Sequence, residues 1–154
     1  MKARTLVFTL TLCIIGAATC FAQDPFAGTW KLNEAKSKLA AAAAKNSTVV
    51  YEAAGDSVKV TIDGTDSAGN PLHSEWTGKF DGKDYPVTGD PSSDARAVKK
   101  VNNRTLTFAV KKGGKLISSG RIVVAPDGRS RTVTSTGTDS KDKKVRSFAI
   151  YDKV

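Results

Sequence analysis

The stretch VKVTID, residues 58–63, decides the fold class. Val58, Val60 and Ile62 occupy every second position and alternate with polar residues. Side chains of a β-strand point alternately to the two faces of a sheet, so this pattern predicts a strand with one buried face. The stretch TLTFAVK, residues 105–111, alternates in the same way. Both stretches favour an all-β protein.

Turn-forming residues separate such stretches about every ten positions. Asn-Asn at 102–103, Gly-Gly at 113–114 and Asp-Gly at 127–128 adopt positive φ at little cost, as tight hairpins require. Consecutive antiparallel strands are therefore expected. We place them at residues 28–33, 47–53, 57–63, 72–80, 95–101, 104–111, 115–124, 130–137 and 143–151. A further short extended piece is expected around Tyr85, where Pro86 restricts it to a sheet edge or a strand start.

One segment departs from this pattern. Residues 33–45, NEAKSKLAAAAAK, begin with a capping-type Asn and continue with strong helix formers. The sequence therefore predicts one short helix between the first and second strands.

Many antiparallel strands joined by tight turns remove their free edges by closing into an up-and-down barrel. We expect such a barrel, with about 8–10 strands. A two-sheet sandwich is the alternative, but it needs longer crossover connections, and only the loop at 90–94 and the early helix are available for these.

The first 22 residues have the pattern of a secretory signal peptide. Lys2 and Arg4 precede an apolar run, and small residues end the segment. A single domain is then expected over residues 23–154, secreted or periplasmic, with no later stretch long and apolar enough to span a membrane. Cys20 leaves a lipoprotein as an alternative, although Thr19 stands where a lipobox has a smaller residue. Cleavage after Ala22 would remove both cysteines and with them any disulfide.

The chain is basic, with a formal charge of +9 that falls to +7 without Lys2 and Arg4. This charge could attract polyanions. The lysines are scattered over predicted turns and strand ends, where they commonly keep sheets soluble. We expect a solvated surface, with no specific nucleic acid as partner.

Gly28, Thr29 and Trp30, at the start of the first strand, resemble the Gly-x-Trp signature of the lipocalins and the wider calycin group. GTWKLN at 28–33, DGKDYPVTG at 81–89 and the ending AIYDKV are similar to small, largely uncharacterised secreted lipocalin-like proteins of bacteria. The resemblance implies that Gly28 and Trp30 belong to a structural barrel closure in which an Arg from near the last strand covers the Trp. Arg146 is the matching candidate, and Arg121 is the alternative.

Few residues suggest catalysis or metal binding. His73 is the only histidine, so a single chain offers neither a histidine metal cluster nor a Ser-His-Asp triad. The carboxylates fall mostly in turns, where Asp is preferred for local hydrogen bonds. We expect that the chain is not an enzyme and has no catalytic residue, and that it binds no metal and no cofactor.

The resulting hypothesis is a monomeric barrel that binds a small apolar or amphipathic molecule. The candidate ligand-binding residues on the inward face are Val60, Trp76, Phe108, Ser118 and Ile122. The alternative is a basic module of the cell envelope that binds surfaces or polyanions.

Overall fold

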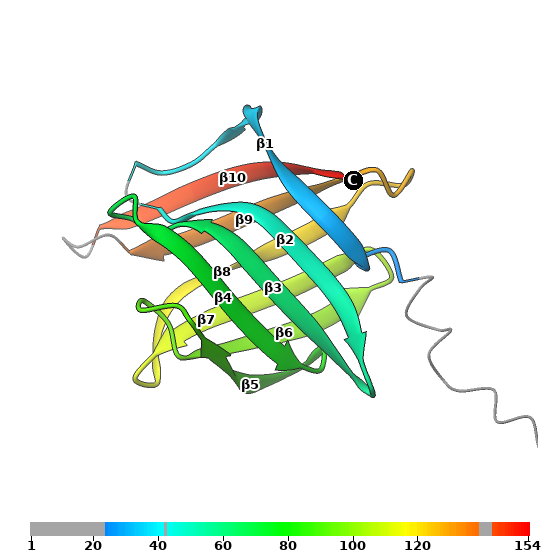
Figure 1. The fold of residues 1–154 in the computed structure, drawn as a ribbon, viewed down its shortest axis with the longest axis horizontal. Coiled ribbons are helices and arrows are strands. Elements are labelled where there is room, and N and C mark those ends of the chain that lie inside the picture. The colour runs from blue at the N-terminus through cyan, green and yellow to red at the C-terminus, as the bar shows by residue number, and fades with distance from the viewer. Residues whose placement is uncertain (1–23, 42, 139–142) are drawn as a thin grey trace, which may run out of the picture.

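A computed structural model describes residues 24–41, 43–138 and 143–154. The predicted signal peptide lies outside these residues. The described chain forms ten strands that close into one antiparallel barrel (Figure 1). The strands are β1 (Gly28–Lys38), β2 (Lys45–Ala54), β3 (Ser57–Thr65), β4 (Pro71–Gly78), β5 (Asp81–Thr88), β6 (Ala95–Asn102), β7 (Thr105–Lys112), β8 (Lys115–Val124), β9 (Ser130–Thr138) and β10 (Lys144–Lys153).

Each strand pairs with the next along the chain, and β1 pairs with β10 to complete the ring. The closing pair places Trp30 opposite Lys153 and Leu32 opposite Tyr151. This topology confirms the all-β, up-and-down barrel expected from the alternating pattern. Figure 1 shows β2, β3 and β4 crossing in front of the strands that form the opposite wall.

The helix expected at residues 33–45 was wrong: no helix is present in the described part of the chain. Instead, β1 continues to Lys38, with a register shift between Asn33, opposite Ile150, and Lys38, opposite Phe148. The Ser37 hydroxyl joins the two strands, because it accepts from the Ile150 N–H at 2.9 Å. A short helix is only marginally stable in water, so pairing with β10 outweighs the helix propensity of this segment.

The extended piece around Tyr85 is confirmed and forms part of β5. Its expected place at a sheet edge or a strand start was wrong, because Pro86 lies inside β5, opposite Ala95, in a barrel that is closed. Asp81 and Gly82 begin this strand, with a register shift between Asp81 and Asp84 and a φ of 83° at Gly82. The pairing of β4 with β5 is short, with Trp76 opposite Val87 as one of two registered pairs. It is the shortest pairing around the barrel.

The core fills one end of the barrel, where β1 begins and β10 ends. Phe26, Trp30 and Leu106 are fully buried, and Trp76 is 1% exposed. Trp76 and Phe80 stack with their centroids 6.4 Å apart. We call this the closed end. No helix in the ranges that the structure describes could span a membrane.

Candidate functional site

The closed end is built around Trp30. Its indole Nε1 donates a hydrogen bond to the Phe26 carbonyl at 2.9 Å, so its polar atom is satisfied inside the core. The Arg131 guanidinium carbon lies 4.8 Å from the Trp30 ring centroid, and the Lys153 ammonium lies 5.2 Å from it. Cations over an aromatic face are attracted by its negative charge distribution.

The guanidinium over Trp30 therefore belongs to Arg131. The expectation that Arg146 covers Trp30 was wrong. Arg131 lies opposite Tyr151 at the closed end, whereas Arg146 lies opposite Thr136, nearer the other end of β10. Arg146 also alternates with the inward-facing residues of β10 and is exposed, as Arg121 is on β8. The signal in the sequence was that Arg131 shares the face of Val133, which is unusual for a residue that normally stays in water.

The barrel contains a partly open cavity of about 90 Å³, which we call the inner cavity. Its apolar and aromatic lining consists of Val49, Val60, Ile62, Trp76, Val98, Phe108, Ile122 and Val133. Its polar lining consists of Asn46, Tyr51, Arg96, Arg131 and Tyr151. Of the five residues expected to bind ligand, Val60, Trp76, Phe108 and Ile122 line this cavity. Ser118 does not.

The two arginines give the inner cavity its electrostatic character. Arg131 is 2% exposed, and its Nε and Nη1 atoms have no hydrogen-bond partner. The Nε atom of Arg96 is also buried and unpartnered. Burial lowers the pKa of Arg96, against the opposing influence of Tyr51 and Asp90. The cavity is therefore electropositive.

The tyrosines and Trp76 hold this arrangement in place. The Tyr151 hydroxyl donates to the Asn46 carbonyl at 2.9 Å, and burial raises the pKa of Tyr151 to about 12, so the hydroxyl keeps its proton at neutral pH. The Trp76 indole donates to the Arg96 carbonyl at 2.9 Å, which ties β4 to β6 beneath the cavity.

Asp90, in the loop between β5 and β6, is the carboxylate whose charge raises the pKa of Arg96. Burial raises its pKa, but hydrogen bonds from Ser92 and Ser93 and the charge of Arg96 leave the pKa lowered overall. The Ser92 and Ser93 hydroxyls both donate to its carboxylate at 2.6 Å. Asp90 is thus held ionised by its own loop, and no ion pair joins it to Arg96 among the described residues.

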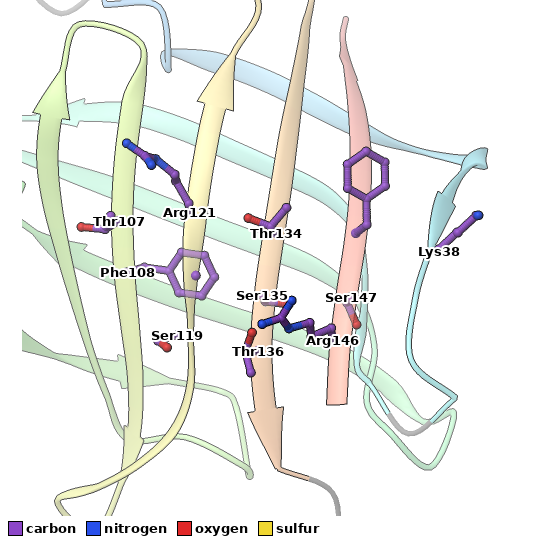
Figure 2. A pocket seen from close by; sticks show the side chains of 12 residues that line it. Lys38, Thr107, Phe108, Ser119, Arg121, Thr134, Ser135, Thr136, Arg146 and Ser147 are labelled. Atoms are coloured by element: carbon purple, nitrogen blue, oxygen red, sulfur yellow. The ribbon is translucent and has the colours of Figure 1, made fainter. Parts of the chain in front are cut away.

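A second, larger pocket of about 780 Å³ lies on the outer face of β7 to β10, and we call it the outer pocket (Figure 2). One row of cross-strand neighbours forms its centre: Thr107, Arg121, Thr134, Phe148 and Lys38. Figure 2 shows Arg146 reaching from β10 towards Ser135 and Thr136 on β9. The lining contains three cations, several hydroxyls and no carboxylate.

The barrel wall is thin between the two pockets. Phe108 lines both of them. Its ring packs against Gly120, where an added Cβ would lie 2.6 Å from the Phe108 ring and 2.2 Å from the Thr134 carbonyl oxygen. Glycine is therefore required at this position by close approach.

Within the described ranges, no other arrangement of side chains suggests chemistry. No group of three or more potential metal-ligating side chains occurs in the part of the chain that the structure describes. His73 is exposed, and its Nδ1 lies 2.6 Å from the Asp63 carboxylate on the barrel surface. No protein-family model matches the chain, and no curated protein matches it either.

Proposed function

We propose that this chain is a secreted or periplasmic, non-enzymatic, lipocalin-like protein that binds one small amphipathic molecule in the inner cavity. The observation that carries the proposal is a cavity inside a closed barrel that combines an apolar wall with buried, unpartnered guanidinium donors. Ligand sites are mostly apolar concavities with a few polar groups that orient the ligand.

The size of the inner cavity limits the ligand. A volume of about 90 Å³ is well below the roughly 300–1,000 Å³ of drug-sized pockets. A short aliphatic chain or a single ring suits this space, whereas a long acyl chain does not. The ligand is accordingly smaller than the lipid-like molecules that lipocalins suggest.

The closed end supports the lipocalin-like part of the proposal. Gly28 and Trp30 stand at the start of β1, and Arg131 on the penultimate strand covers the Trp30 ring. A Trp covered by an Arg from near the last strand is what the resemblance implies, with Arg131 in place of Arg146. The inner cavity lining holds no carboxylate, histidine or cysteine, which favours binding over acid-base or nucleophilic chemistry.

A larger side chain in the cavity should weaken binding. Val133 lines the inner cavity, so Val133→Phe should weaken the binding of single-ring probes such as phenol and benzamide at least tenfold, which is about 1.4 kcal/mol. Val123→Phe makes the same change on the outer face of neighbouring β8, where Val123 is 39% exposed. Binding to both variants and to the unsubstituted protein is measured by ligand-observed NMR.

The control variant should bind like the unsubstituted protein. The inner cavity would not be the ligand site if Val133→Phe and Val123→Phe bound the probes equally well. The same conclusion would follow if no short aliphatic or single-ring probe showed saturable binding to the unsubstituted protein.

The outer pocket favours a second candidate function, the binding of an extended polyanion. Lys38, Arg121 and Arg146 line it without a carboxylate among them, and Phe148 is 41% exposed beside them. No ion pair involves these three cations among the residues that the structure describes. Phosphate or carboxylate groups of a polymer would supply the missing anions.

This second function predicts that the charges act locally. The double substitution Arg121→Gln with Arg146→Gln should weaken the binding of polygalacturonate or dextran sulfate about tenfold at low salt, and should flatten the dependence of binding on salt. Arg104→Gln with Arg129→Gln removes the same charge from exposed turns and should have little effect. Equal losses in the two double variants would show that only net charge matters.

A further inference from the structure

We infer that the ligand of the inner cavity is a small monocarboxylate whose carboxylate group binds the side chains of Arg131 and Arg96. This inference rests on the proposed function, because it names the chemical class of the molecule that the cavity takes.

Arg131 is buried among aromatic rings without acceptors for two of its donor atoms. Its guanidinium carbon lies 4.8 Å from the Trp30 ring, 5.0 Å from the Tyr51 ring and 4.8 Å from the Tyr151 ring. Three aromatic faces attract its charge, but they do not replace the hydrogen-bond acceptors that buried N–H groups need. The Nε and Nη1 atoms remain unpartnered, and burying donors without acceptors costs free energy.

A second guanidinium group, that of Arg96, also lines the inner cavity. Arg96 lines it from β6, and its buried Nε has no hydrogen-bond partner either. The Arg131 guanidinium carbon lies 5.0 Å from the Tyr51 ring centroid, and the charge of Tyr51 also raises the pKa of Arg96. Both guanidinium groups line the same small cavity, so the charge of each would attract an anion bound there.

No carboxylate side chain lines the inner cavity, so the anion would be a separate molecule. In the described ranges neither arginine forms an ion pair, and the lining of the cavity includes no Asp or Glu. Asp90 acts on Arg96 from the loop between β5 and β6, where Ser92 and Ser93 already use its oxygens. A buried charge is normally paired, so the chain leaves a place for an anion that it does not supply itself.

The shape and polarity of the site select a carboxylate. Guanidinium groups match the planar oxygens of a carboxylate, and the pairing is charge-assisted. The remaining wall is hydrocarbon, contributed by residues such as Val60, Ile122 and Val133, and would cover a short chain or a single ring. A cavity of about 90 Å³ leaves no room for a long chain behind the carboxylate.

The test compares acids with their neutral amides. Benzoate and benzamide, and butyrate and butyramide, are titrated into the unsubstituted protein by calorimetry. We expect each acid to bind at least tenfold more tightly than its amide. Arg96→Met should weaken benzoate binding at least tenfold and change benzamide binding less than threefold, because only the charged contact is lost.

Two further variants separate local from general effects. Arg104→Met removes a charge from an exposed turn and should leave benzoate binding unchanged. Arg131→Met should also weaken benzoate binding, and its fold is checked by circular dichroism. If that variant does not fold, Arg96→Met and the acid-amide pairs still decide the question.

The outcomes distinguish the inference from the function on which it rests. Equal affinity for acid and amide, or equal loss in Arg96→Met and Arg104→Met, would overturn the carboxylate inference and leave a ligand in the cavity. Failure of acids, amides and neutral probes alike to bind would overturn both.

Discussion

Replacing Trp30 with alanine should lower the free energy of unfolding by about 3 to 5 kcal/mol, the usual range for truncating a large aromatic in a core. Trp30 is fully buried, so the substitution removes its packing and leaves a cavity. It also leaves the Phe26 carbonyl without its donor and Arg131 without one of its three aromatic neighbours. These losses act in the same direction.

Denaturant unfolding followed by far-ultraviolet circular dichroism measures this effect. Phe148→Ala is the matched control, because Phe148 is an aromatic residue that is 41% exposed on the outer face. It should change the free energy of unfolding by less than about 1 kcal/mol. A Trp30→Ala protein as stable as the control would contradict the assignment of Trp30 to the closed end.

Gly120→Ala should lower the free energy of unfolding by about 2 to 3 kcal/mol, at the upper end of what overpacking costs. The added Cβ would lie 2.2 Å from the Thr134 carbonyl oxygen of the neighbouring strand and 2.6 Å from the Phe108 ring. Backbone of a paired strand cannot move aside cheaply. Glycine weakens a strand interior in general, so propensity alone predicts the opposite sign.

Ser119→Ala is the control on the same strand, since Ser119 lines the outer pocket and faces away from Phe108. It should change stability by less than about 0.5 kcal/mol. Gly120→Ala unfolding at the same denaturant concentration as the unsubstituted protein would show that the wall at this position is looser than the structure indicates.

The strands were predictable because their signal is local. The segment expected at 115–124 is β8 itself, and closure into a barrel follows from the tight turns between such strands. The prediction of a helix at 33–45 was wrong because helix propensity is a local signal, whereas the structure of this segment depends on a strand far away in the sequence. Residues 33–38 pair with β10, more than a hundred positions away, and helix propensity contains no information on that pairing.

The candidate site was predictable in part for the same reason. Alternation along a strand places Val60, Trp76 and Ile122 on the inward face, and each lines the inner cavity. Alternation also places Arg96 with Val98, and Arg131 with Val133, but an arginine in a strand is usually exposed. That their donors are buried and unpartnered depends on contacts between strands, which a single sequence does not display.

The outer pocket could not be predicted from the sequence. Its cations come from three strands, and they form one surface only through the registers of the strands between them. Lys38 joins them because β1 replaces the expected helix. Its neighbour across the strands, Phe148, is an apolar residue that alternation places outside the core.

Nuclear Overhauser effects can show directly whether a small molecule binds inside the barrel. Protein with labelled valine and isoleucine methyl groups, saturated with benzoate, allows nuclear Overhauser effects between the benzoate ring and the protein to be recorded. We expect contacts to the methyl groups of Val60, Ile122 and Val133, which line the inner cavity. Contacts confined to Val123 on the outer face, or no contacts at all, would contradict binding inside the barrel.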